Sequence, residues 1–193
     1  MRPRVLEEGY GIGPKLLFRL VRLVSGRPLP DAARITFYRS DFYGTNAKRF
    51  TQEAMRGPSS WSVGDRELMA AYLSRENDSA FCVGAHSATA ARAYRDRDRV
   101  DAVLADLGSA PIEEGLRATL GMLAKLAREG TLQVDDIRAV RAAGVSARQI
   151  EDALAVCFAF NVTGRLANAF AFQLLDPEGF DAGAKYLLKR GYG

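Results

Sequence analysis

Apolar residues recur at helical spacing along most of the chain, and no segment alternates apolar and polar residues as a half-buried strand would. Breaker and capping residues divide this pattern into separate segments. The pattern predicts helices over residues 15–24, 45–55, 62–75, 80–94, 100–107, 111–128, 135–143, 146–174 and 182–189. We therefore expect an all-α fold of about eight helices.

Capping residues mark where several of these helices begin. Ser62 with Asp65, and Ser146 with Gln149, have the three-residue spacing of a capping box. Ser79 stands directly before the segment 80–94, where its side chain can cap the helix. This segment is rich in Gly and Ala, and small side chains let helices approach closely. We therefore expect the helix over residues 80–94 to be central.

The chain shows no internal repeat and no Pro/Ser-rich linker, so we expect one domain over residues 1–193, with residues 1–30 as a helical extension. In that extension, Arg19 and Arg22 interrupt a short apolar stretch and share one helical face. The stretch is too short and too charged for a membrane span, and it is typical of an amphipathic helix that covers a core or a partner subunit.

The overall composition is that of an ordinary globular protein, with 48% hydrophobic and 26% charged residues among 193. The net charge of +4 is small and scattered, so we expect no nucleic-acid partner. Because the apolar stretch near the N-terminus is short and charged, we also expect no membrane partner. Two cysteines do not form a disulfide framework, which favours the cytoplasm.

The most informative residues are Glu67, Ser79, Cys82 and His86. Cys82 and His86 are four residues apart, so a helix places them on one face. A thiol in the first helical turn lies near unpaired backbone amides and the positive end of the helix dipole, which favour the thiolate. We therefore expect a lowered pKa for Cys82, with Glu67 on the preceding helix facing His86.

Less specific interpretations exist for each residue. A single histidine in a chain is more often structural than catalytic, and a buried free cysteine is more often packing. Neither interpretation explains why the two lie together at helical spacing. One histidine and two distant cysteines make a poor zinc ligand set, so we expect neither a metal nor a cofactor.

The spacing resembles that of the AhpD-like alkylhydroperoxidases of the carboxymuconolactone decarboxylase superfamily. Those proteins have Glu, eleven residues, Cys-x-x-Cys, three residues and His, and the same spacing joins Glu67, Ser79, Cys82 and His86. Flanking stretches are also similar to the peroxidase-related branch, notably residues 57–61, 66–71, 81–87, 141–146 and 160–167. The resemblance covers residues 30–175 and implies the AhpD-like helical fold.

The chain departs from this pattern at Ser79, which replaces the first cysteine of the pair. The internal disulfide of the redox-active members therefore cannot form here. The cysteine beside the histidine, which the resemblance makes the peroxidatic one, is kept as Cys82. Cys157 lies in an apolar run, and we interpret it as a core residue.

Three functions remain open. The resemblance implies a hydroperoxide-reducing antioxidant protein with Cys82 as the active thiol, His86 and Glu67 as a proton relay, and an external thiol as reductant. The alternatives are a non-redox acid–base enzyme of the carboxymuconolactone decarboxylase type and a degenerate, non-catalytic oligomer. The resemblance also implies a homo-oligomer, either a trimer or a hexamer.

Two polar residues stand out in the otherwise apolar helix predicted over residues 146–174. Asn161 and Arg165 are expected to line the site or an interface, or to form structural hydrogen bonds.

Overall fold

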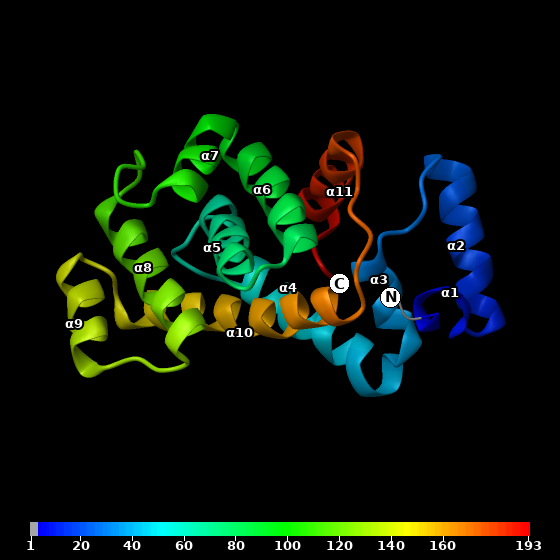
Figure 1. Cartoon of the computed structure of the whole chain (residues 1–193), viewed down its shortest axis with the longest axis horizontal. Helices are drawn as coiled ribbons and strands as arrows, with labels where there is room; N and C mark the ends of the chain where they lie inside the picture. The colour runs from blue at the N-terminus through cyan, green and yellow to red at the C-terminus, as the bar shows by residue number, and fades with distance from the viewer. Residues whose placement is uncertain (1–3) are drawn as a thin grey trace.

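The computed structural model describes residues 4–193, and in that range the chain forms eleven α-helices, one π-helical segment and no β-strand. The elements are α1 Val5–Glu8, α2 Ile12–Ser25, α3 Asp31–Tyr38, η1 Ser40–Gly44, α4 Thr45–Arg56, α5 Val63–Glu76, α6 Ala80–Tyr94, α7 Arg97–Ala105, α8 Glu114–Glu129, α9 Val134–Ala142, α10 Ala147–Ala169 and α11 Pro177–Arg190 (Figure 1). The all-α prediction is confirmed, although the chain has more helices than the eight or so expected.

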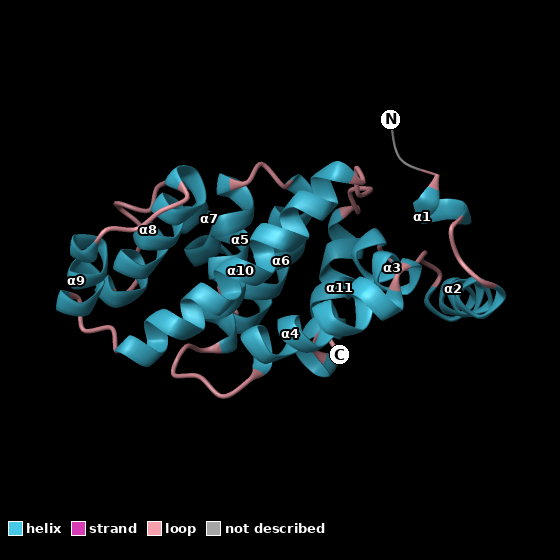
Figure 2. Cartoon of the chain, turned by 90° about the horizontal axis from the view of Figure 1, so that it is seen from below, coloured by secondary structure: helices cyan, strands magenta, loops and turns pink. Residues whose placement is uncertain are grey.

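The centre of the bundle is α5, which α6, α7, α8 and α10 surround (Figure 1). Ten residues of this helix are buried, from Gly64 through Arg66–Ser74. We expected the helix over residues 80–94 to be central, and α6 packs along α5 and also contacts α7, α10 and α11 (Figure 2). The buried surface of α5 includes the charged residues Arg66 and Glu67, whose side chains have hydrogen-bond partners inside the protein.

The two predicted capping boxes fix the starts of long helices. Ser62 Oγ accepts from the Asp65 amide at 3.0 Å, while the Asp65 carboxylate accepts from the Ser62 amide at 2.9 Å, and α5 begins there. Ser146 and Gln149 form the same reciprocal pair at the start of α10. Both predicted helix starts are therefore confirmed.

Several helix ends differ from the prediction because of local backbone contacts. The chain leaves α10 at Ala169, five residues before the expected end, and Ala171 adopts a left-handed φ of 47°. The following helix, α11, begins at Pro177 rather than at residue 182, because Asp176 accepts from the Gly179 amide at 2.7 Å. A proline in the first turn loses no hydrogen bond that the helix needs.

The helices that the periodicity does not predict are α1 and α3, together with the π-helical segment η1. All three are short, with four, eight and five residues respectively. A helix of only one or two turns shows too little periodicity in the sequence to be distinguished from a loop.

The buried side chains form two clusters. The larger one fills the space among α5, α8 and α10, with Leu68, Leu120 and Phe160 at its centre. The smaller one surrounds Cys82 and consists of Leu6, Ile35, Phe81, Cys82, Ala167 and Phe172. Helices α1 and α3 near the N-terminus therefore contribute to the packing around this cysteine.

The helix α2 lies at one end of the molecule, away from α5 (Figures 1 and 2). Its inner face packs through Phe18, whose ring meets those of Tyr10 and Phe37 edge to face. Its outer face carries the exposed apolar residues Ile12, Leu16, Leu20, Leu23 and Val24. Within residues 4–193, no helix combines the length and the apolar character that crossing a membrane requires.

Candidate functional site

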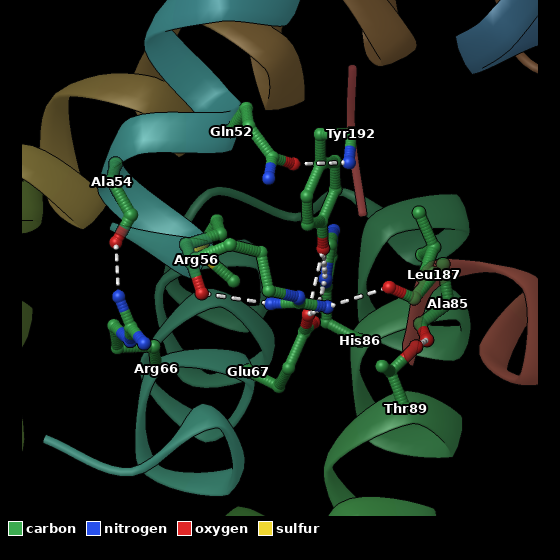
Figure 3. A network of polar contacts seen from close by, with 11 residues as sticks. Gln52, Ala54, Arg56, Arg66, Glu67, Ala85, His86, Thr89, Leu187 and Tyr192 are labelled. Atoms are coloured by element: carbon green, nitrogen blue, oxygen red, sulfur yellow. Dashed lines mark hydrogen bonds and ion pairs between the residues drawn. The ribbon is translucent and has the colours of Figure 1, made fainter. Parts of the chain in front are cut away.

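Glu67 lies in the middle of α5 with no exposed surface, and both of its carboxylate oxygens are bonded. Oε2 lies 2.7 Å from His86 Nδ1 on the neighbouring helix α6. Oε1 accepts from an Arg56 guanidinium nitrogen at 2.7 Å and from the Tyr192 hydroxyl at 2.8 Å. Figure 3 shows these three side chains converging on the carboxylate from separate segments. The predicted pairing of Glu67 with His86 is therefore present in the structure.

The carboxylate of Glu67 is stabilised as an anion inside the protein. Burial by itself would raise its pKa, but the hydrogen bond and charge of His86, together with Arg56, outweigh burial and hold the pKa below its ordinary value. A carboxylate that stays ionised accepts hydrogen bonds only. His86 Nδ1 is therefore assigned as the donor, which leaves Nε2 as the nitrogen that can exchange a proton.

The imidazole of His86 is also held by aromatic neighbours. The Phe160 ring on α10 meets it edge to face at a centroid distance of 4.3 Å. The Tyr192 ring lies nearly parallel to it, at 6.3 Å and 20°. His86 itself is buried, with 5% of its surface exposed. A ring fixed by packing on both sides and by a carboxylate at Nδ1 has one orientation, as acid–base chemistry requires.

Arg56 and Tyr192 belong to this network, and sequence analysis did not identify them. Arg56 ends α4, donates to the backbone carbonyls of Met55 and Leu187, and lies 5.0 Å from the centre of the Tyr192 ring. Tyr192 follows α11, and its amide donates to the Gln52 side chain at 2.7 Å. No spacing in the sequence links either residue to Glu67, because the tertiary fold alone brings them together.

Tyr192 remains a neutral donor in this setting. Burial, followed by the negative charge of Glu67, raises the pKa of its phenol well above the ordinary value. Its hydroxyl lies 3.4 Å from His86 Nδ1 in addition to its bond with the carboxylate. The site therefore holds a phenol, an imidazole and a guanidinium around one anion.

Cys82 lies in the first turn of α6, one turn before His86, and is 1% exposed. Burial raises its pKa, and the neighbouring Ser79 and Ser74 hydroxyls oppose that effect only in part. The lowered thiol pKa expected from the helix dipole is therefore wrong for this conformation, because desolvation outweighs the dipole. Among the described residues, no hydrogen bond joins Cys82 to His86.

Ser79 occupies the predicted position before α6 but does not cap it. Its backbone angles, φ −100° and ψ 83°, differ from those of a capping serine, and its side chain makes no capping bond. The hydroxyl oxygen is buried and has no hydrogen-bond partner among residues 4–193. The prediction that Ser79 caps the helix is wrong.

Asn161 and Arg165 lie outside the network around Glu67. Asn161 accepts from the Asn77 side chain at 3.0 Å and donates to Cys157 Sγ at 3.2 Å, so its hydrogen bonds are structural. Both polar residues line an open groove of about 710 Å³ between α8 and α10, which Cys157 also lines. The structure does not connect this groove to Glu67 or Cys82.

Cys157 behaves as the core residue that sequence analysis expected. It is 2% exposed, and burial raises its pKa to about 11. Within residues 4–193, no three His, Cys, Asp or Glu side chains converge in the manner of a metal site.

Comparison with known proteins rests on structure, since no family model and no curated protein matches the chain. An uncharacterised peroxidase-related protein with an alkylhydroperoxidase AhpD core, from Ralstonia eutropha JMP134, superposes with a TM-score of 0.74 over 91% of each chain, at 21% identity. The chain has the fold of the AhpD core.

Two further structures share the AhpD-core fold. A peroxidase-related protein from Silicibacter sp. TM1040 superposes with a TM-score of 0.73 over 87% of each chain, at 22% identity. The debrominase Bmp8 superposes with a TM-score of 0.68 over 90% of this chain and 92% of its own, at 16% identity. The AhpD-core fold is thus common to proteins described as peroxidase-related and to a debrominase.

Proposed function

We propose that this AhpD-core protein is a peroxidase-related antioxidant enzyme that reduces hydroperoxides at Cys82, with His86 and Glu67 as the proton relay. The observation that carries the proposal is the 2.7 Å contact between Glu67 and His86, one helical turn from Cys82. A buried carboxylate that fixes an imidazole is the arrangement with which enzymes activate a nearby nucleophile.

The reaction begins with removal of the Cys82 proton by His86 Nε2, with Glu67 stabilising the imidazolium that results. The thiolate attacks the terminal oxygen of the hydroperoxide, the O–O bond breaks, and Cys82 becomes a sulfenic acid. The leaving alkoxide takes the proton from His86 and departs as an alcohol.

Regeneration requires an external thiol, because Ser79 cannot supply the second sulfur of an internal disulfide. A first thiol condenses with the sulfenic acid to give a mixed disulfide and water. A second thiol attacks that disulfide and releases the Cys82 thiol. The protein thereby returns to its starting state, and two reducing thiols become one disulfide.

The test measures hydroperoxide consumption in the presence of a small thiol and records the mass of the intact protein with a sulfenic-acid trap. We expect Cys82→Ser to abolish turnover and trapping, His86→Ala to lower the rate by about 10²–10⁴-fold as loss of a general acid–base does, and Cys157→Ser to leave both unchanged. Trapping at Cys157 instead of Cys82 contradicts the proposal.

A second candidate is non-redox acid–base chemistry of the carboxymuconolactone decarboxylase type. The observation that favours it is that the network of Glu67, His86, Arg56 and Tyr192 is complete without a sulfur atom, while burial raises the pKa of Cys82. Turnover of a small carbonyl or lactone compound that survives Cys82→Ala but not His86→Ala supports this candidate. Because one protein with this fold is a debrominase, a brominated compound belongs in the same screen.

A degenerate, non-catalytic oligomer is the third candidate, and assembly is also part of the first. We propose a homo-oligomer, a trimer or a hexamer, in which the exposed apolar face of α2 packs against a partner subunit. Sedimentation that shows a monomer at micromolar concentration contradicts this proposal. A stable oligomer that turns over none of the substrates supports the third candidate over the other two.

A further inference from the structure

The hydroxyl of Ser79 has an unusual environment for a serine that precedes a helix. Ser62 and Ser146 hold equivalent positions with extended backbones, and their oxygens accept backbone amides at 3.0 and 3.1 Å. Ser79 has different backbone angles, and its oxygen accepts no amide. Its side chain therefore does not serve the helix that follows.

This hydroxyl is also buried without any partner in residues 4–193, and the residue is 1% exposed. A buried polar group that lacks a hydrogen bond destabilises the folded state. The neighbouring helix α10 confines it further, since a Cβ atom placed on Gly164 would lie 3.8 Å from Ser79 Oγ. The partner of this hydroxyl must therefore come from its immediate surroundings.

The thiol of Cys82 lies three residues after Ser79, in the first turn of α6. Ser74 is the other hydroxyl near that sulfur, but it already donates its hydrogen to the Ala70 carbonyl at 2.7 Å. Ser79 is thus the hydroxyl beside Cys82 whose hydrogen is uncommitted. We propose that Ser79 is a positioning residue that donates a hydrogen bond to the Cys82 thiolate and so stabilises the reactive form of the sulfur.

The proposal deepens the proposed function, since it assigns a role at the same cysteine. A donor to a thiolate favours the charged form, which burial disfavours. The Ser79 hydroxyl acts on the pKa of Cys82 in this direction. The residue that removes the possibility of an internal disulfide therefore supplies a donor in its place.

Other groups around the sulfur stay the same when Ser79 is changed. They include the phenol of Tyr43 from η1, which interacts with Cys82 by charge, and the Glu67–His86 pair one turn along α6. The remaining side chains of the surrounding cluster are apolar and come from α1, α3, α6, α10, α11 and the segment after α10. A shift in the pKa of Cys82 that follows Ser79→Ala is therefore due to loss of the Ser79 hydroxyl.

The test compares Ser79→Ala with Ser87→Ala, which removes another buried, unpartnered hydroxyl, this one from within α6. Thiolate formation is followed by its ultraviolet absorbance against pH, and each protein is measured as the difference from the same protein carrying Cys82→Ser. This difference cancels Cys157 and the tyrosines that do not interact with Cys82, and Tyr43 is followed separately by its phenolate absorbance at longer wavelength, where a thiolate does not absorb. The method needs no reagent to reach the buried sulfur.

We expect Ser79→Ala to raise the pKa of Cys82 by about one to two units, which matches the loss of one hydrogen bond to a charged group, and Ser87→Ala to leave it unchanged. Coincident titrations for Ser79→Ala and the wild type, or equal shifts for both variants, overturn the assignment. If Ser79→Ala shifts the pKa while no variant or wild type consumes hydroperoxide, the proposed function fails and the role of Ser79 stands. If turnover requires Cys82 but the pKa does not move, the reverse holds.

Discussion

The replacement of Glu67 by Gln removes the one negative charge at the centre of the buried network. Gln has nearly the same shape as Glu, so packing within α5 is preserved. The change leaves Arg56, whose side chain is 11% exposed, without its carboxylate partner. It also removes the acceptor that fixes His86 Nδ1.

The magnitude follows from burial. Removal of one partner from a buried ion pair costs about 3–5 kcal/mol, because the remaining charge is uncompensated. The Gln oxygen still accepts one hydrogen bond, so we expect the lower end, about 3 kcal/mol. For a chain of this size, that corresponds to a fall of about 6–12 °C in Tm.

Glu76→Gln provides a matched control on the same helix. Glu76 also contacts two arginines, Arg75 and Arg128, but their side chains are 35% and 56% exposed. Ion pairs with exposed partners contribute about 0–1 kcal/mol. Urea denaturation followed by circular dichroism measures the free energy of unfolding of both variants.

The pH dependence supplies a second check on Glu67. The folded-state pKa of Glu67 lies below its ordinary value of 4.5, so its contribution to stability is complete above that pH and is lost as the pH falls through the lower, folded value. The stability gap between the wild type and Glu67→Gln should therefore be constant near neutral pH and shrink in acid. A cost no larger than that of Glu76→Gln, or a gap that widens in acid, refutes the reasoning.

Other predictions concern stability and thiol chemistry. Tyr192→Phe removes one hydrogen bond to the buried carboxylate, and denaturation should show a loss of about 1.5–3 kcal/mol without a change in helix content. Gly121 in α8 has open space around it, so Gly121→Ala should raise the free energy of unfolding by about 0.5–1 kcal/mol. At Gly44, by contrast, a Cβ atom would lie 2.6 Å from a backbone carbon of Thr36, so Gly44→Ala should lower the Tm. Alkylation of Cys157, mapped by peptide analysis, should have its midpoint near pH 11. A midpoint below pH 9 contradicts the prediction that burial keeps this thiol protonated.

Most of the helices could be predicted from the sequence because the signals that define them lie within each helix. Apolar periodicity and reciprocal capping at Ser62 and Ser146 placed the long helices. The sequence did not predict the π-helical segment Ser40–Gly44, because no pattern of residue types marks it. It also predicted a cap at Ser79, where the backbone departs from the geometry of a capping residue.

The residues of the site also fall into those that the sequence predicted and those that it did not. Glu67 and His86 were found because both belong to adjacent helices joined by a short turn. Arg56 and Tyr192 were missed because they reach the carboxylate from other elements, and the hydrogen bond from Tyr192 spans 125 residues. The direction of the pKa of Cys82 was wrong because spacing along a helix reveals the dipole but not the apolar cluster packed over it.

The meeting of distant segments at Glu67 limits how the site can be transplanted. A designer who grafts the hairpin of α5 and α6 onto another scaffold transfers the carboxylate, the imidazole and the thiol, but neither the guanidinium from α4 nor the phenol that follows α11. In such a graft the carboxylate would keep the cost of burial and lose two of its three donors, so its proton affinity would rise. The chemistry of the hairpin is therefore not modular, and a working copy needs a host that supplies two more donors at the same point.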